Sequence, residues 1–262
     1  MKGTKKLVFV VERDLRTLFQ FKALIIMRTI WFAAQVAFFG LIASRMVVPE
    51  LADIYFEYYV AGVVIMMLYS ASVFIGYDIS EEAEHGVFEY LLSLPVSRKE
   101  LVLGRSIGGG IRSFIFVGPL IAIALGVIGL ANPVNLLITF LALFLFAFGV
   151  SGMSITIIVS LKSGDRFDIL MGVVNALIVR LSTTMYPLFF VEKASPTYAT
   201  ISKFNPVTFA SDLFRWGTGI ERYLTVSPMP LAAIIGLVIF FFTFTFIGVT
   251  IYERRLEGGG WQ

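Results

Sequence analysis

The sequence predicts an all-α integral membrane protein with six transmembrane helices. Of its 262 residues, 58% are hydrophobic and 15% are charged, whereas soluble domains average about 25% charged residues. A hydrocarbon core about 30 Å thick needs about 20 mainly apolar residues in helical form. Six stretches are long enough, and they cover residues 23–45, 57–77, 112–131, 134–160, 168–190 and 229–252. Each stretch is continuous, whereas barrel strands alternate over about ten residues, so we expect a helical bundle.

Residues 4–22 are predicted to form an interfacial amphipathic helix. Val8, Val11 and Leu15 recur at helical spacings of three and four, and the charged residues fall mostly on the other face. Such a helix lies along the membrane surface. A plain positively charged anchor is the alternative. Because charged residues continue as far as Arg28, the segment does not resemble a cleaved signal peptide, and we expect the N-terminus to be retained.

The distribution of Lys and Arg predicts that both termini are cytoplasmic. Six crossings put the termini on one side, and Lys and Arg accumulate in cytoplasmic connections. The side of the termini carries Lys2, Lys5, Lys6, Arg13, Arg16, Lys22, Arg98, Lys99, Arg105, Arg112, Lys162, Arg166, Arg254 and Arg255. The opposite side carries only Arg45, Lys193, Lys203, Arg215 and Arg222. We therefore expect a multi-pass protein of the plasma membrane. The net charge of +3 reflects this asymmetry, and no nucleic-acid partner is expected.

The second and third crossings are joined by a charged cytoplasmic segment, residues 79–112. An acidic cluster is followed by Gly86 and by apolar residues at helical spacing. This pattern predicts a short amphipathic helix from about Glu84 to Leu94, which Pro95 ends. An ordinary solvated loop that happens to be helical is the alternative interpretation.

A second helix is expected to begin at Ser97 and to continue into the third crossing. Ser97 and Glu100 form an S-x-x-E capping box, in which each side chain satisfies a backbone N–H group. Glycines 108–110 follow in this helix. They would allow either close helix packing or a bend, and the sequence does not distinguish the two.

Two stretches carry more specific patterns. The first runs from Glu82 to Arg105 and reads E-x-x-x-G-V-F-E-Y-L-L-S-L-P-V-S-R-K-E-L-V-L-G-R; the second reads FNPVTFASDLFR and ends at Arg215. They resemble the segment between the second and third crossings, and the NP-x-x-(aromatic)…R motif after the fifth, of ABC-2 type permeases. These permeases are membrane subunits of ATP-driven exporters, and the chain resembles drug-export permeases in length and pattern. It departs from the family pattern at residues 182–187, which read STTMYP.

The resemblance implies that residues 1–262 form a single ABC-2 type transmembrane domain that docks on an ATPase subunit through a coupling helix. The chain has no G-x-x-x-x-G-K-[ST] phosphate loop. It is therefore not expected to be an enzyme or to bind a cofactor or metal, and ATP and Mg²⁺ would lie on the partner. A second permease, identical or homologous, is also implied. The residues assigned to ATPase coupling are Glu82, Glu84, Gly86, Phe88, Glu89, Leu91, Leu92, Pro95, Arg98 and Glu100.

Residues 191–227, between the fifth and sixth crossings, are predicted to form two outer re-entrant helices. They are too apolar for a freely solvated loop. Asn205 is expected to cap the second helix, with Pro206 at its first position. Re-entrant backbone is tolerated where it packs against protein or a water-filled cavity. We expect an outer gate formed by Pro187, Asn205, Pro206 and Arg215; an interfacial aromatic belt is the alternative.

Polar residues inside the predicted crossings are candidate functional residues, because burying them in lipid is costly. Arg28 and Glu57 lie near membrane boundaries and are interpreted as anchors. Arg180 lies deeper in the fifth crossing and, with Asn175, is a candidate for substrate binding. A hydrogen bond to a neighbouring helix is the alternative role for Arg180. The single histidine, His85, is interpreted as a surface residue.

Export of a hydrophobic or amphipathic substrate, such as a drug-like compound or a lipid, is the favoured function. A polysaccharide or glycan exporter is the alternative within the family. An ATPase-independent carrier or channel and a structural subunit are the alternatives outside it. A proton- or sodium-coupled carrier would need acidic residues at mid-membrane, and the deep positions of crossings one to four and six carry none.

Overall fold

The computed structural model describes residues 3–20, 22–46, 49–129 and 132–256, and the regular secondary structure in these ranges is entirely helical. The predicted all-α fold is therefore confirmed for this part of the chain. In chain order the helices are α1 (Gly3–Gln20), α2 (Lys22–Gln35), the π-helix η1 (Val36–Gly40), α3 (Leu41–Met46), α4 (Pro49–Glu84), α5 (Val87–Ser93), α6 (Arg98–Ile128), α7 (Pro133–Leu161), α8 (Gly164–Arg180), α9 (Leu188–Ala194), α10 (Pro196–Lys203), α11 (Pro206–Thr218) and α12 (Leu231–Leu256).

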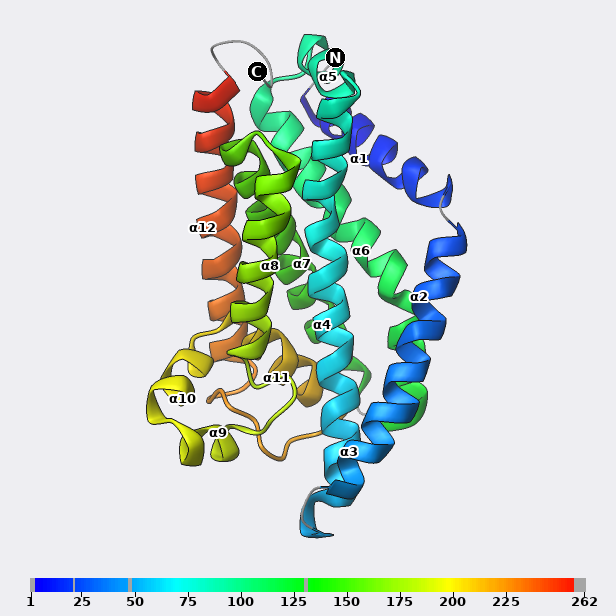
Figure 1. Cartoon of the computed structure of the whole chain (residues 1–262), viewed down its shortest axis with the longest axis vertical. Coiled ribbons are helices and arrows are strands. Elements are labelled where there is room, and N and C mark those ends of the chain that lie inside the picture. The colour runs from blue at the N-terminus through cyan, green and yellow to red at the C-terminus, as the bar shows by residue number, and fades with distance from the viewer. Residues whose placement is uncertain (1–2, 21, 47–48, 130–131, 257–262) are drawn as a thin grey trace.

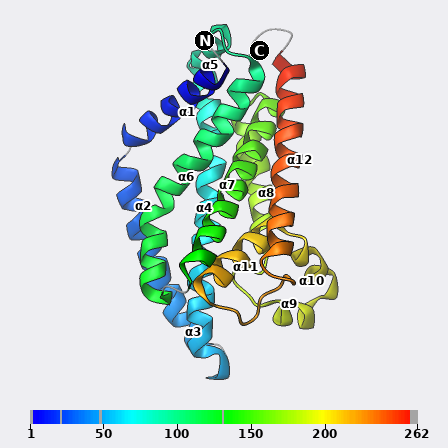
Figure 2. The ribbon, with the colours of Figure 1, turned by 180° about the vertical axis from the view of Figure 1, so that it is seen from behind.

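Long helices run along the molecule, and short ones gather at its two ends. Helices α4, α7, α8 and α12 follow the long axis (Figure 1). Helix α5 lies at one end with the start of α1 and the end of α12, whereas α9, α10 and α11 lie at the other (Figure 1). We call these the α5 end and the α11 end. From behind, α1 lies against α6 near the α5 end (Figure 2). Helix α7 forms the centre of the core, because it packs against α4, α6 and α12.

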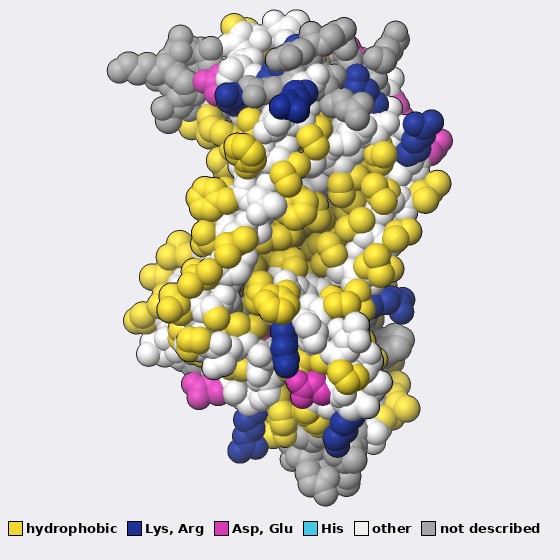
Figure 3. Space-filling model, turned by 90° about the vertical axis from the view of Figure 1, so that its left-hand side faces the viewer, with side chains coloured by type: hydrophobic (Ala, Val, Ile, Leu, Met, Phe, Trp, Pro, Cys, Tyr) yellow, Lys and Arg dark blue, Asp and Glu magenta, His cyan; other side chains and the backbone are white. Residues whose placement is uncertain are grey.

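Four described helices are long and apolar enough to cross a membrane. They are Ile54–Glu84, Arg98–Ile128, Pro133–Leu161 and Leu231–Tyr252. Hydrophobic side chains cover the middle of the face in Figure 3, and charged side chains lie mainly toward its two ends. This distribution suits a protein whose middle contacts hydrocarbon and whose ends contact water. The helices therefore indicate a multi-pass membrane protein.

The first and fifth predicted crossings differ from these four helices. Residues 23–45 are divided among α2, η1 and α3. The fifth crossing, expected over residues 168–190, was placed too far along the chain, because α8 ends at Arg180. The hydroxyl of Ser182 donates to the carbonyl of Val179 at 2.6 Å, a local bond that competes with continued helix. Six crossings therefore stay a prediction.

The α11 end contains three short helices where two were predicted. Helices α9 and α10 precede α11, and only a single residue, Ser195, separates them. Oδ1 of Asn205 accepts the N–H of Val207 at 2.9 Å, and Pro206 is the first residue of α11. The predicted cap and the predicted proline position are therefore confirmed.

The glycines of α6 allow close packing and do not interrupt the helix. A Cβ atom at Gly108 would lie 2.9 Å from Oδ2 of Asp14 in α1. One at Gly109 would lie 3.0 Å from Oγ of Ser151 in α7. Larger side chains at these positions would therefore push α1 or α7 away from α6.

Candidate coupling segment and membrane cavity

Helix α5 is joined to α4 by a glycine turn and to α6 by a capped helix start. Gly86 has a φ of +69°, in the left-handed region that favours glycine. Beyond α5 the chain passes Pro95, and Oγ of Ser97 then accepts the N–H of Glu100 at 3.2 Å. The carboxylate of Glu100 accepts the N–H of Ser97 at 2.9 Å. The predicted stop and capping box are confirmed, although α5 is shorter at both ends than expected.

Helix α5 has a buried side and an exposed side. Leu91 is buried, and α5 packs on α4. Tyr90 is 65% exposed, and Val87 and Glu89 are also exposed. The side chain of Phe88 lies outside the described part of the structure. Apolar, aromatic and acidic groups therefore share an exposed surface at the tip of the molecule, which we call the α5 face (Val87, Glu89 and Tyr90).

Glu82 does not contribute to the α5 face, because its side chain turns into the protein. Its carboxylate accepts hydrogen bonds from Arg13 of α1 and from Arg105 of α6. One turn earlier in α4, Asp78 forms an ion pair with Arg112 of α6 at 2.5 Å. Helix α4 is therefore joined to α6 by two ion pairs and to α1 by one.

With Asp14 of α1, these residues form the α1–α4–α6 network, in which three arginines balance three carboxylates. Arg105 is 1% exposed and Asp14 is 4% exposed. Burial raises the pKa of Asp14, although the guanidinium groups of Arg105 and Arg13 oppose this shift. Removing one partner of a buried pair leaves an uncompensated charge, which is strongly destabilising. The network therefore fixes the relative positions of the three helices.

At the α11 end, Arg215 is fully buried and joins three segments. Its guanidinium donates to the carbonyls of Tyr58 at 3.3 Å and Thr184 at 2.7 Å. It also pairs with Asp212 at 3.2 Å and lies 3.4 Å from the centre of the Tyr58 ring. Asp212 accepts two N–H groups from the connection to α12, at 2.5 and 2.9 Å. Arg215 thus holds α4, α11 and the segment after α8 together.

Asn205 joins the end of α8 to the start of α11. Its amide group donates to the carbonyls of Ile178 at 2.7 Å and Leu181 at 3.2 Å, in addition to the cap that it provides for α11. Pro187, at the entry to α9, is buried as well. The residues predicted to form an outer gate therefore lie within the packed interior of the α11 end, with Pro206 half-buried beside them.

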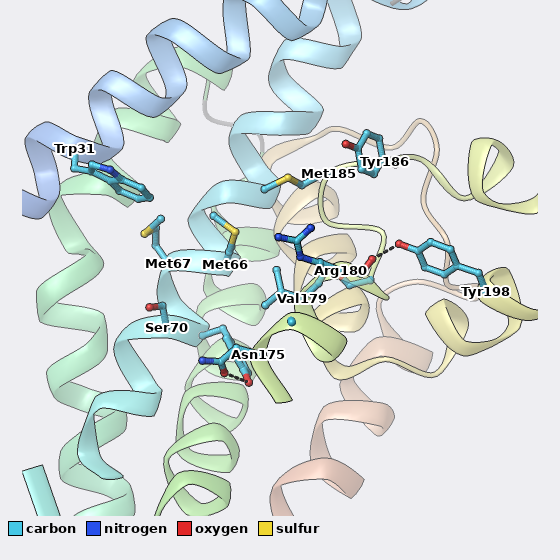
Figure 4. A pocket seen from close by; sticks show the side chains of 13 residues that line it. Trp31, Met66, Met67, Ser70, Asn175, Val179, Arg180, Met185, Tyr186 and Tyr198 are labelled. Atoms are coloured by element: carbon cyan, nitrogen blue, oxygen red, sulfur yellow. Dashed lines mark hydrogen bonds between the residues drawn. The ribbon is translucent and has the colours of Figure 1, made fainter. Parts of the chain in front are cut away.

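A cavity of about 620 Å³ lies between α2, α4 and the end of α8. Trp31 of α2 points toward Met66 and Met67 of α4, and the guanidinium of Arg180 lies on the α8 side of the same space (Figure 4). Asn175 also lines the cavity. The structure thus brings together the two residues of the predicted fifth crossing that were candidates for substrate binding.

Two tyrosines orient the polar groups of this cavity. The hydroxyl of Tyr69 donates to Oδ1 of Asn175 at 2.8 Å. The hydroxyl of Tyr198 donates to the backbone carbonyl of Arg180, at the last residue of α8 (Figure 4). Helix α10 therefore supports the end of α8, beside the cavity.

A family model described as "ABC-2 family transporter protein" matches residues 35–251. The chain belongs to the ABC-2 transporter family. A search among curated proteins found no match. The ABC-2 match includes α5 and α11 but not α1 or Trp31. The α1–α4–α6 network therefore links a helix outside the matched range to the two helices that flank α5.

The residues assigned to ATPase coupling in this ABC-2 permease differ in accessibility. Glu84, Gly86, Glu89 and Pro95 are exposed; Leu92, Arg98 and Glu100 are half-buried. Sequence reasoning did not connect Glu82 with Arg105, or Asp78 with Arg112. A signal was present, because Asp78 and Glu82 are four residues apart and Arg105 and Arg112 seven, spacings that put each pair on one helix face.

Proposed function

We propose that this ABC-2 permease exports a hydrophobic or amphipathic substrate across the plasma membrane, using ATP hydrolysed by a separate nucleotide-binding subunit. ATP and Mg²⁺ bind to that subunit, which docks on the α5 end in the cytoplasm. The observation that carries the proposal is the α5 face, an exposed surface at the tip of two helices long enough to span the membrane.

The α5 face has the composition of a protein contact. Aromatic side chains are enriched at interfaces and often contribute most of the binding free energy. Tyr90 is such a side chain, and Glu89 beside it provides a charge for a basic partner group. Two residues separate α5 from α4, and four separate it from α6. These connections are too short to absorb a displacement of α5, so its movement is transmitted to α4 and α6.

Movement at the α5 end would reach the cavity through α4. This helix runs from Pro49 to Glu84 and contributes Met66, Met67, Tyr69 and Ser70 to the cavity lining. Because the α1–α4–α6 network joins α1 to α4 and α6, we expect α1 to move together with these two helices. A second permease, identical or homologous, would face α2 and α8 and complete the pathway that the cavity begins.

The test is to place a negative charge on the α5 face. We expect Tyr90→Asp to abolish co-purification of the permease with its ATPase subunit and the stimulation of ATPase activity in reconstituted vesicles, because a buried charge without a partner opposes docking. Membrane insertion should be unchanged, since Tyr90 is exposed in the permease itself.

Asp165→Asn is the matched control. Asp165 is also exposed, lies in the first turn of α8 and is not part of the α5 face. The control should keep the ATPase subunit bound. Normal co-purification and stimulated ATPase activity in Tyr90→Asp would contradict docking at the α5 face.

A further inference from the structure

The cavity between α2, α4 and α8 is lined by one positively charged side chain, and no acidic side chain in the described ranges lines it to balance that charge. Neither Asp nor Glu lines it, whereas the guanidinium of Arg180 does. Among the described residues, this guanidinium has neither an ion pair nor a hydrogen bond, because only the backbone carbonyl of Arg180 is bonded, to Tyr198. The guanidinium is exposed beside a mainly apolar lining, where a carboxylate or phosphate can form charge-assisted hydrogen bonds with it. The lining therefore favours a negatively charged ligand.

Asn175 adds hydrogen-bond donors to the same lining. Tyr69 donates to Oδ1 of Asn175, which occupies the acceptor side of the amide and orients its NH₂ group (Figure 4). Within the described part of the chain, that NH₂ group donates to no other residue. The cavity thus presents a guanidinium and an amide NH₂, both of which only donate. Carboxylates and phosphates are acceptors that match this set.

Most of the remaining lining area is apolar and adaptable, although hydroxyl groups such as those of Ser70 and Ser182 also line the cavity. Trp31, Met66, Met67 and Met185 surround the space beside Arg180 (Figure 4). Methionine side chains are flexible and adjust to ligands of different shape. A volume of about 620 Å³ lies within the range of pockets that bind small organic molecules, roughly 300–1,000 Å³. One end of the ligand must therefore be polar and anionic, and the remainder apolar.

We propose that this cavity binds an amphiphile with a single anionic group, whose carboxylate or phosphate contacts Arg180 and Asn175 and whose apolar chain contacts Trp31 and the methionines. This inference deepens the proposed export function, on which it rests for its biological role, by naming the charge class of the substrate. Binding itself requires only the permease.

Trp31 makes the binding measurable without the ATPase subunit. The chain has three tryptophans, so Trp216→Phe and Trp261→Phe leave Trp31 as the only reporter. Brominated chains quench tryptophan fluorescence on contact. The permease in nanodiscs of zwitterionic lipid is titrated with three probes of equal chain length: dibromostearate, dibromostearamide and dibromostearyl-trimethylammonium. Quenching is compared at equal membrane-bound mole fractions, which removes differences in partitioning.

We expect dibromostearate to quench Trp31 at a concentration at least tenfold lower than the neutral or the cationic probe. Arg180→Gln should remove this preference, Arg180→Lys should keep part of it, and Arg180→Glu should reverse it toward the cation. Lys193→Gln is the control, because Lys193 is an exposed cation of α9 outside the cavity lining. A phosphatidylglycerol with brominated chains is the last probe, and it distinguishes a two-chain lipid from a single-chain amphiphile as the source of the anion.

Equal quenching by the three stearyl probes, or an unchanged preference in Arg180→Gln, would overturn the proposal. These outcomes are independent of the ATPase assay. If Tyr90→Asp fails to uncouple the ATPase while the charge preference at Trp31 is observed, the proposed docking at the α5 face is wrong and the anionic site stands. If Tyr90→Asp uncouples the ATPase but no charge preference is observed at Trp31, only the anionic site is wrong.

Discussion

Single buried charges determine how the α5 end is assembled. The carboxylate of Glu82 accepts hydrogen bonds from two arginines of different helices, Arg13 and Arg105. Arg105 is almost completely buried. Its position in a stretch that resembles the coupling segment of ABC-2 permeases made it a candidate for contact with the ATPase. The structure directs its carboxylate toward α1 and α6, so its effect on the α5 face is indirect.

Replacing Glu82 with Gln should destabilise the permease by about 3 kcal/mol, because the buried Arg105 would lose the carboxylate to which it is hydrogen-bonded. The measurement is the thermal midpoint of the purified protein in detergent. Glu81→Gln is the control, since Glu81 is the exposed neighbour in the same helix. Equal midpoints for the two variants would show that the network does not stabilise the fold.

At the scale of elements, the packing of α1 on α6 depends on glycine. Val10 and Asp14 of α1 lie against Gly104 and Gly108, four residues apart on one face of α6. A Cβ atom at Gly104 would lie 2.9 Å from Val10, as close as the one at Gly108 would lie to Asp14. Helix α1 therefore packs closely on α6 where Gly104 and Gly108 lack side chains, and the α1–α4–α6 network holds it in this position.

Gly108→Val should displace α1 from α6 and expose the α1–α4–α6 network to solvent. Hydrogen–deuterium exchange of residues 3–20 should rise, together with a loss of thermal stability. Gly126→Val provides a matched control in the same helix, because a Cβ there would meet nothing within 4 Å and, unlike Gly118, Gly126 does not precede Pro119. Both changes carry the same cost in helix propensity, so a difference between them isolates the contact with α1. If exchange in α1 were the same in both variants, close packing at Gly108 would be rejected.

Local features of the elements could be predicted from the sequence, whereas contacts between elements could not. The capping box at Ser97 and the Asn205–Pro206 helix start depend on residues only two or three positions apart, and both were predicted. The inward turn of Glu82 depends on Arg13, which is 69 residues away. The burial of Arg215 depends on Tyr58, 157 residues away. Periodicity within one helix carries no information about which other helix supplies such a partner.

At the scale of the whole molecule, the two ends have different constructions. The α5 end carries a short exposed helix, the start of α1 and the end of α12, whereas the α11 end is covered by three helices, and Arg215 and Asn205 connect this end to the bundle (Figure 1). The cavity lies on the side of α4 that faces α2 and α8. This difference between the two ends supports the proposed function, in which an ATPase subunit docks at the α5 end and substrate leaves at the α11 end.

The orientation of these ends can be tested with single cysteines, because the natural chain contains none. Ser93→Cys places a thiol at the end of α5, and Thr197→Cys places one in α10; both positions are exposed. We expect a membrane-impermeant maleimide to label Thr197→Cys in intact cells and to label Ser93→Cys only after permeabilisation. The excess of Lys and Arg on the side of the termini is the physical reason, because cytoplasmic connections retain these residues. The unsubstituted chain, which has no thiol, is the control for background. Labelling of Ser93→Cys in intact cells would place α5 outside and would rule out its contact with a cytoplasmic ATPase.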